Sequence, residues 1–272
     1  MIKLIAIDLD GTLVNDQKEI PLENIKAIHR AQAAGVRVVL CTGRPYTAVK
    51  PLVDQLGFTD HDLVAVFNGG QIRKAVSGQV LSEKTISQAD MLRWYAETER
   101  LQIPFNIIDS DWVYEPASYP EGHPSFYVGK VSSAPATHAD FNQFAADHRF
   151  NKLVVTVEAD YLEQQLGQMD PDLMAEFSLS RSYPFQLEIM AQGIDKGYAL
   201  DQLSQVLNID IADMVAIGDQ LNDLAMIEKA GHGVAMGNAE PEIKALAEYI
   251  TDTNNNAGVA KAIDYYLQKE KE

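Results

Sequence analysis

The sequence predicts an α/β protein: a doubly wound parallel sheet forms the core, and an α+β domain is inserted into it. Two observations predict this fold class. Apolar, β-branched runs alternate with helical periodicity over residues 1–70 and again from Lys196 onward. Between these two halves, residues 83–190 instead carry short strand-like runs separated by proline and glycine.

The first half of the core is expected to have the order strand, helix, strand, helix, strand. Three apolar runs, which are typical of strands buried on both faces, are residues 2–7, 36–41 and 63–67. The first helix is expected to start at Pro21 and end near Gly35, and the second to start at Pro45. This order favours parallel strands joined by helical crossovers.

The middle of the chain predicts a separate domain. After the break at residues 68–70, a hairpin is expected with its turn at Ser77-Gly78. The insert itself should hold helices at 87–101 and around 161–168, and strands at 152–157, 177–179 and 185–189. We therefore expect the core to comprise residues 1–82 and 191–272, and the inserted domain to comprise residues 83–190.

The second half of the core resumes the α/β pattern. An apolar stripe predicts a helix directly after Lys196. The remaining expected elements are a strand at 214–217, a helix starting near Asn222, short strands at 234–236 and 249–250, and a closing helix.

The overall charge restricts the class of partner. Lysine and arginine number 22 against 39 acidic residues, which gives a formal charge of −17. Such a surface repels nucleic acid and anionic lipid, so a general role in binding either is not expected. A phosphorylated metabolite would need local positive charge at its binding site.

Cysteine usage and apolar runs indicate the compartment. The single cysteine, Cys41, excludes an internal disulfide framework and fits a reducing environment. No apolar run approaches the roughly 20 residues of a membrane span, and the N-terminus lacks the layout of a signal peptide. We expect a cytoplasmic protein. Cys41 itself is interpreted as a core residue at a strand end.

The first of four chemistry-bearing segments is Asp8-Leu9-Asp10-Gly11-Thr12, at the end of the first predicted strand. Two carboxylates this close repel each other unless a proton or cation lies between them. A carboxylate can attack phosphorus, and a second one past a tight glycine turn can act as general acid and then base. The alternative is a strand end followed by a solvated acidic turn.

The second segment, Cys41-Thr42-Gly43-Arg44, follows the next strand and precedes a helix. The hydroxyl of Thr42 and the backbone N–H groups of Gly43 and Arg44 could bind phosphate oxygens near that helix N-terminus. The alternative is an ordinary turn from strand to helix with a threonine cap.

The third segment, Asp195-Lys196-Gly197, places a lysine at a helix start, where the helix dipole disfavours a cation. A bound anion or a nearby pair of carboxylates would explain it. The alternative is a surface lysine.

The fourth segment runs from Gly218-Asp219 through Asn222-Asp223 and follows another apolar strand. Because the carboxyl ends of parallel strands share one edge of the sheet, the carboxylates of Asp219 and Asp8 should meet there. Capping of the following helix is the alternative role for Asn222 and Asp223. Oxygen donors converging at one edge favour Mg²⁺ as the balancing cation.

Together, in this order, the four segments resemble the motifs of the haloacid dehalogenase superfamily in its phosphatase branch. The insert resembles the C2-type cap of Cof-type enzymes. The YidA-type bacterial sugar phosphatases are similar in three segments, namely Thr42-Gly43-Arg44-Pro45, Phe67-Asn68-Gly69 and residues 196–200. The resemblance covers the whole chain and implies a Rossmann-like core.

The resemblance also implies a role for each residue. Asp8 is expected to be the nucleophile and a magnesium ligand, and Asp10 the general acid/base that binds the metal through its backbone carbonyl. Asp219 is expected as the remaining protein ligand, supported by Asp223. The expected phosphoryl contacts are the side chains of Thr42, Lys196 and Asn222, Gly43, and the backbone N–H groups of Leu9 and Asp10.

The implied activity is hydrolysis of small phosphorylated metabolites, sugar phosphates among them, through an aspartyl-phosphate. The inserted domain would close over the site and read the leaving group, with Tyr114, His123, Phe126 and Tyr127 as candidate contacts. Two alternatives stay open: a phosphomutase or phosphotransferase on the same scaffold, and a non-catalytic regulator that binds a phosphometabolite. A monomer or small homo-oligomer is expected.

Overall fold

The chain forms two compact units in its computed structural model, which describes residues 1–132 and 134–269. The first, called the core unit here, comprises Met1–Gly43, Lys50–Glu83 and the chain from Asp195 onward. The second, called the insert unit, comprises Arg44–Val49 and Lys84–Ile194.

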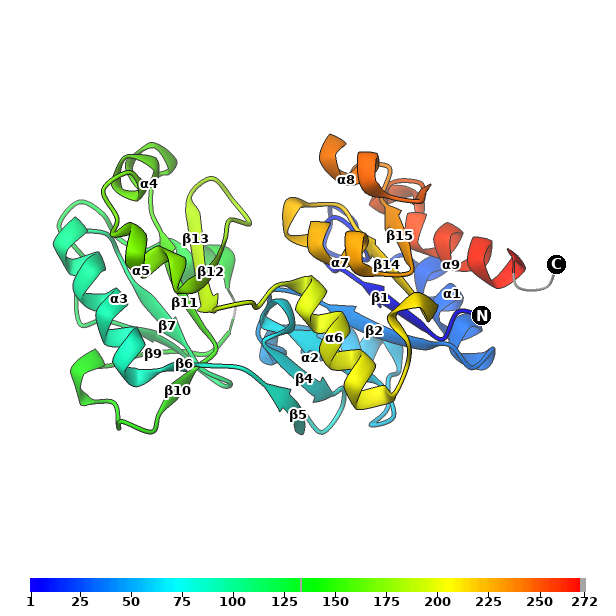
Figure 1. Ribbon diagram of the computed structural model, residues 1–272, viewed down its shortest axis with the longest axis horizontal. Helices are drawn as coiled ribbons and strands as arrows, with labels where there is room; N and C mark the ends of the chain where they lie inside the picture. Colours follow the sequence, from blue (N-terminus) through cyan, green and yellow to red (C-terminus); the bar gives the residue numbers. More distant parts are fainter. Residues whose placement is uncertain (133, 270–272) are drawn as a thin grey trace. The chain divides into compact units, whose positions relative to one another are not determined.

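The core unit contains an eight-stranded sheet in the order β16-β15-β14-β1-β2-β3-β4-β5 (Figure 1). Its parallel strands are β1 (Leu4–Ile7), β2 (Arg37–Cys41), β3 (Leu63–Val66), β14 (Met214–Gly218), β15 (His232–Ala235) and β16 (Tyr249–Ile250). The hairpin of β4 (Gln71–Lys74) and β5 (Val80–Glu83) extends it in antiparallel fashion. The predicted doubly wound parallel sheet is confirmed.

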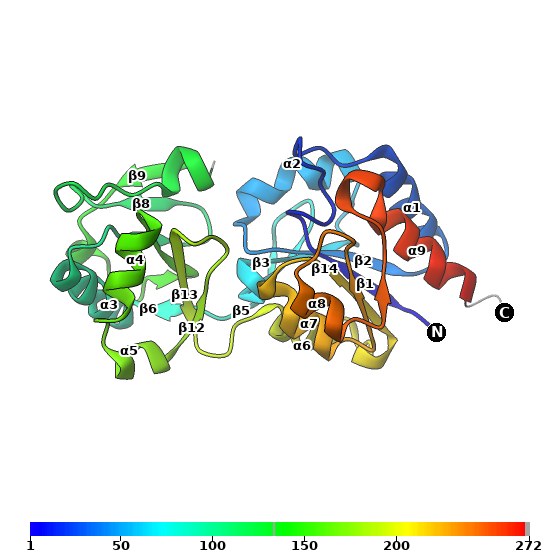
Figure 2. The same ribbon diagram turned by 90° about the horizontal axis from the view of Figure 1, so that it is seen from above.

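Helices cover both faces of this sheet, which is why its central strands are apolar apart from the exposed Arg37 at the start of β2. The helices of the core unit are α1 (Leu22–Ala33), α6 (Lys196–Leu207), α7 (Leu224–Lys229), α8 (Pro241–Leu246) and α9 (Gly258–Lys269), and α2 (Tyr46–Leu56) belongs to it from Lys50 onward. Helix α1 packs against α9, and α6 packs against α7 on the other face (Figure 2). All four residues of β1 are buried, as expected for a strand covered on both faces.

The register of the central strands sets the position of the residues that follow them. Ile7 pairs with Leu40 of β2 and with Ile217 of β14, so all three strands reach the same edge together. The residues after them are Asp8, Thr42 and Asp219. Three of the four predicted chemical segments therefore begin at one edge of one sheet.

The insert unit is built around a six-stranded sheet in the order β12-β13-β11-β7-β8-β9. Its strands are β7 (Asn106–Ile108), β8 (Val113–Glu115), β9 (Ala136–His138), β11 (Lys152–Thr156), β12 (Phe177–Ser180) and β13 (Gln186–Ala191). A separate pair joins β6 (Ile86–Ser87) to β10 (Arg149–Phe150). The helices are α3 (Gln88–Leu101), α4 (Ala159–Leu166) and α5 (Pro171–Ala175).

Two helices, α5 and α8, are additions to the sequence expectations. Each begins with proline at its first turn, and they are only 5 and 6 residues long. Helices this short give no measurable apolar periodicity, so they could be found only from their proline starts. No helix among the described residues has both the length and the apolarity needed to cross a membrane.

Candidate active site

Three buried carboxylates meet at the edge where β1 and β14 end. Oxygen atoms of Asp8, Asp219 and Asp223 lie within 4.8 Å of one another, and we call these residues the acid cluster. Asp8 directly follows β1, and Asp219 directly follows β14. Asp223 ends the short 3₁₀ turn Leu221–Asp223 that comes just before α7. The sheet register therefore explains the meeting of residues more than 200 positions apart.

Lys196 is the counterion of the acid cluster. Its Nζ donates to Oδ1 of Asp8 and to Oδ1 of Asp223, both at 2.5 Å. The side chain is only 1% exposed, so the surface-lysine alternative is wrong. Two carboxylates offset the unfavourable position of an ammonium at the start of α6. The helix start itself is capped by Asp195, whose Oδ1 accepts from the N–H of Tyr198 at 2.7 Å.

Asp223 also organises the backbone around Asp219. Its Oδ2 accepts from the backbone N–H groups of Asp219 at 2.9 Å and of Gln220 at 3.1 Å. Gly218 makes room for it, since a Cβ there would lie 2.5 Å from the Cβ of Asp223. With Lys196 on Oδ1 and two amides on Oδ2, Asp223 is held as a support for the other two acids.

Asp219 is fixed by the loop that follows β1. The hydroxyl of Thr12 donates to its Oδ1 at 2.8 Å. Gly11 has φ of +80°, and a Cβ on it would lie 2.3 Å from Oδ2 of Asp219. Only glycine fits this turn, both for its backbone conformation and for the close approach of the carboxylate.

Burial shifts the proton affinities of these groups. Burial first, and then the neighbouring Asp223, raise the pKa of Asp8 well above its usual range. The same causes raise the pKa of Asp219 to about 6. Burial acts against the charge of Lys196, but Asp223 and Asp8 outweigh it and raise its pKa. The lysine therefore stays an ammonium.

The acid cluster has more negative charge than Lys196 can balance. Three carboxylates face one ammonium, all of them buried. Buried charges are stable only when paired or bound to a cation. The donors offered are all carboxylate oxygens, which suit a hard divalent cation such as Mg²⁺. The residues present therefore fit a divalent metal.

Asp10 lies apart from the acid cluster. Its carboxylate is partly exposed and accepts from Nζ of Lys18 at 2.9 Å. Leu9, between the two aspartates, is fully buried, and its carbonyl accepts from the backbone N–H of Val14 at 3.0 Å. The turn thus directs the Asp8 and Asp10 side chains to different surroundings.

The remaining predicted residues lie in nearby loops. Thr42 is buried, donates its N–H to the carbonyl of Ala65 at 2.9 Å and accepts from the N–H of Asn68 at 2.8 Å. Gly43 packs on Asn68, since a Cβ there would lie 3.0 Å from its Oδ1. Asn222 is half-buried in the turn that carries Asp223. No hydrogen bond joins Asn222 to the acid cluster within the described chain.

The candidate leaving-group contacts are engaged within the insert unit. Tyr127 is buried, with Nζ of Lys152 5.8 Å from its ring centre. The hydroxyl of Tyr114 donates to Asp109 at 2.7 Å. The two others also contact neighbouring side chains: His123 stacks on Tyr161, and Phe126 lies under Lys130.

Other reactive groups are placed outside this chemistry. Cys41 is buried, and burial raises its pKa to about 12, so it stays a thiol.

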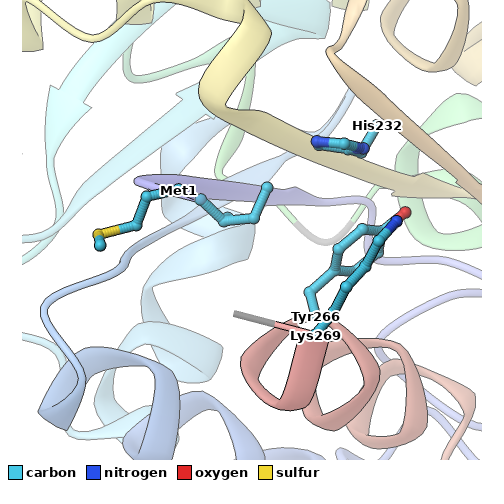
Figure 3. A pocket seen from close by; sticks show the side chains of 5 residues that line it. Met1, His232, Tyr266 and Lys269 are labelled. Atoms are coloured by element: carbon cyan, nitrogen blue, oxygen red, sulfur yellow. The ribbon is translucent and has the colours of Figure 1, made fainter. Parts of the chain in front are cut away.

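A cavity of about 330 Å³ lies at the opposite edge of the core sheet, where β1 and β15 begin (Figure 3). Its lining residues are Met1, Ile2, His232, Tyr266 and Lys269, none of which belongs to the four segments.

Sequence reasoning gave no role to Thr12, Lys18 or Asn238, which contact the predicted site. Thr12 and Lys18 bond to Asp219 and Asp10, as described above. The third is Asn238, whose Nδ2 donates to the carbonyl of Gly11 at 2.8 Å. Only one signal was available for it, namely its position two residues beyond the end of the core strand predicted at 234–236.

Comparison with known proteins gives one consistent family. The family model of haloacid dehalogenase-like hydrolases matches residues 5–263. "Putative phosphatase YxeH" of Bacillus subtilis is 36% identical over 264 residues, covering 97% of each chain. "5-amino-6-(5-phospho-D-ribitylamino)uracil phosphatase YcsE" of the same bacterium is 33% identical over 266 residues, covering 98% of this chain and 96% of its own.

A solved structure agrees with these sequence matches. A haloacid dehalogenase-like hydrolase from Bacteroides thetaiotaomicron superimposes with a TM-score of 0.83 at 30% identity. The superposition covers 98% of this chain and 100% of that one. The resemblance inferred from the four segments is confirmed.

Proposed function

The chain belongs to the haloacid dehalogenase-like hydrolase family, and we propose that it is a magnesium-dependent phosphatase of small phosphorylated metabolites, sugar phosphates in particular. The observation that carries the proposal is the buried ammonium of Lys196, which bonds to Asp8 and Asp223. The carboxylate of Asp219 lies beside them and adds a negative charge that this ammonium does not balance. A divalent cation would balance the negative charge that Lys196 leaves uncompensated in the acid cluster. The bound cation and Lys196 together would then attract the negative charge of a phosphate group.

Magnesium would be held by carboxylate oxygens of Asp8 and Asp219 and by the backbone carbonyl of Asp10, with Asp223 supporting Asp219. When bound, the ion neutralises charge on the phosphoryl oxygens. All other steps are assigned to side chains and amides of the chain itself.

Asp8 is the proposed nucleophile. Its Oδ1 is held by Lys196, which leaves Oδ2 to attack phosphorus. A bond forms between Oδ2 and phosphorus while the bond from phosphorus to the leaving oxygen breaks, and Asp10 gives its proton to that oxygen. The products of this step are an aspartyl-phosphate and a free alcohol.

The second step returns the enzyme to its starting state. Asp10, now a carboxylate, takes a proton from water as the water oxygen attacks phosphorus. The bond between phosphorus and Asp8 breaks, and inorganic phosphate leaves. In both steps the rate depends mainly on how the reacting groups are positioned and on how well the charge on the phosphoryl oxygens is stabilised.

The phosphoryl oxygens need donors to hold them during both steps. We assign this role to Lys196, the Thr42 hydroxyl, Gly43, Asn222 and the backbone N–H groups of Leu9 and Asp10. Lys196 and the bound cation answer the problem of overall charge, since they make the site locally positive in a protein of charge −17.

The insert unit is proposed to act as the cap that selects the leaving group and excludes water. One relative, YcsE, is named for a phosphorylated ribityl compound, which supports a sugar-like substrate class. We further propose a cytoplasmic location and a monomer or small homo-oligomer, with neither nucleic acid nor membrane as a partner.

The decisive experiment is a screen of phosphorylated metabolites for release of inorganic phosphate. The protein should release phosphate with Mg²⁺ present and lose this activity in excess EDTA. Transfer of phosphate to a second alcohol, with no free phosphate, would identify a phosphomutase or phosphotransferase. Binding of these compounds without any turnover would identify a regulator.

A further inference from the structure

An asparagine outside the four segments connects the loops that carry the acids. Asn238 follows β15, and its side-chain amide lies between the loop after β1 and the loop after β14. We propose that Asn238 is a positioning residue for the metal site, which holds Asp219 and the Gly11–Thr12 peptide in register. The inference rests on the function proposed above.

The contacts of Asn238 reach both loops at once. Its Nδ2 donates to the carbonyl oxygen of Gly11 at 2.8 Å, which is a good hydrogen-bond length. The same Nδ2 lies 3.4 Å from Oδ2 of Asp219, a longer and weaker contact. One amide group therefore anchors the Gly11–Thr12 peptide, one residue beyond Asp10, and steadies a proposed metal ligand.

The orientation of this amide is fixed from its other end. Oδ1 of Asn238 accepts from the backbone N–H of Asn254 at 2.9 Å. A backbone N–H can only donate, so it selects the oxygen of the amide and turns the nitrogen toward Gly11 and Asp219. A flipped amide would lose all three contacts, because its oxygen would face two acceptors and its nitrogen would face a donor.

Asn254 is itself held firmly in place. Its Nδ2 donates to the carbonyl of Val14 at 3.1 Å and to Oδ1 of Asp16 at 3.2 Å. Asn255 adds two bonds to Asp16, one to Oδ2 at 2.9 Å and one from the Asp16 backbone N–H at 3.1 Å. These bonds hold Asn254 and Asn255 against the loop after β1, so the backbone N–H that orients Asn238 is itself fixed.

The position of Asp219 depends on such side support. Within the described residues, Thr12 holds its Oδ1 at 2.8 Å, whereas Oδ2 receives longer contacts from Asn238 at 3.4 Å and from Gln220 at 3.3 Å. Gly11 packs directly against Oδ2, so any movement of the Gly11 peptide moves the carboxylate too. Removal of Asn238 should therefore loosen two proposed metal contacts together.

The test is direct titration of Mg²⁺ by calorimetry with wild type and Asn238→Ala. Groups that orient metal ligands change metal affinity by about 10–100-fold. We expect the Kd for Mg²⁺ to rise about tenfold, and kcat to return to within threefold of wild type at saturating Mg²⁺. If the alanine variant does not fold, the same Mg²⁺ titration is made with Asn238→Ser, whose shorter side chain keeps a hydrogen-bond donor but does not reach both contacts.

The matched control is Asn256→Ala. Asn256 belongs to the same loop, and its Nδ2 donates to Asp252 at 3.2 Å. It makes no contact with Gly11 or Asp219 in the described chain, so its Kd for Mg²⁺ should equal that of wild type.

Three outcomes overturn the proposal. A folded variant at position 238 with unchanged Kd for Mg²⁺ removes its positioning role. A loss of kcat that saturating Mg²⁺ does not restore assigns the residue to another task. Wild-type protein that binds no Mg²⁺ overturns the proposed function as well, which distinguishes that failure from the first two.

Discussion

Among the residues that the structure describes, each unit contains one buried lysine bound to a carboxylate, and the two centres differ in their balance of charge. Lys196 of the core unit and Lys152 of the insert unit are both at most 2% exposed. Each has its Nζ 2.5 Å from a carboxylate oxygen. Burial and distance alone therefore do not distinguish them.

The difference lies in the number of carboxylates beside each ammonium. Lys152 faces one carboxylate, Glu188, whose second oxygen accepts from the hydroxyl of Ser182 at 3.0 Å. Lys196 faces Asp8 and Asp223, with Asp219 beside them. The pair in the insert unit is neutral, whereas the acid cluster keeps an excess negative charge.

This comparison separates two uses of a buried ion pair. A neutral buried pair requires no further charge, and removing one partner is costly because the other is left buried and unpaired. An unbalanced cluster is costly until a cation or proton joins it. Excess buried charge, rather than burial of a lysine, is thus the property that indicates the ligand site in this protein.

The largest expected effect is that of Asp8→Asn. The amide is nearly isosteric but cannot act as the nucleophile, so kcat should fall by about 10⁴-fold or more. The same change removes one excess charge, so the metal-free variant should unfold at a higher temperature than wild type. Phosphate release and thermal unfolding in EDTA measure the two effects. Normal turnover by the folded variant would remove Asp8 from the mechanism.

Lys152→Met tests the neutral pair. It leaves Glu188 buried without its ammonium, which should cost about 3–5 kcal/mol in free energy of unfolding. Adding Glu188→Leu should recover most of that loss, since replacing both partners by apolar groups is often neutral. Urea unfolding of the single and double variants measures this. A single variant as stable as wild type would show that the pair has no structural role.

Lys196→Ala tests the unbalanced cluster with the corresponding change. Loss of one preorganised charge should lower kcat by at least about 10²-fold. It also increases the excess of negative charge, so added Mg²⁺ should stabilise this variant. Steady-state kinetics measures the first effect, and a loss of less than threefold would contradict the proposed role of Lys196.

The sequence was sufficient for the elements with strong periodicity and for the order of the four segments. The runs ending at Ile7 and Ile217 marked the sheet edge, and the lysine at a helix start indicated nearby carboxylates. The sequence was insufficient to assign a role to Asn238, because that role depends on a hydrogen bond to Gly11, which is 227 positions away in the chain. Such a contact leaves no local pattern in the chain.

The same limit applies to charge balance. Nothing in the sequence distinguishes Lys152, which is neutralised by a strand neighbour, from an exposed lysine on a strand. Its partner Glu188 pairs by register with Val154, so the ion pair follows from the pairing of β11 with β13. Register between distant strands is set by tertiary packing, which single-residue preferences do not encode.

The smallest expected effect is a pH-dependent response to Mg²⁺. The pKa of Asp219 is about 6 in the folded protein and that of Asp8 is also raised, both above the unfolded value of about 3.9. The folded state therefore binds more protons, and metal-free stability should fall as the pH rises from about 4 through 6. Below about pH 6, protons compete with the metal for the same oxygens.

Mg²⁺ should consequently stabilise the protein more at pH 8 than at pH 5. At a concentration 100 times its Kd, the ion adds about 2.7 kcal/mol to the free energy of unfolding. Thermal unfolding with and without Mg²⁺ at the two pH values measures the difference, with Lys152→Met as a control that should respond as wild type does. An equal response at both pH values would show that the excess charge of the acid cluster does not govern metal binding.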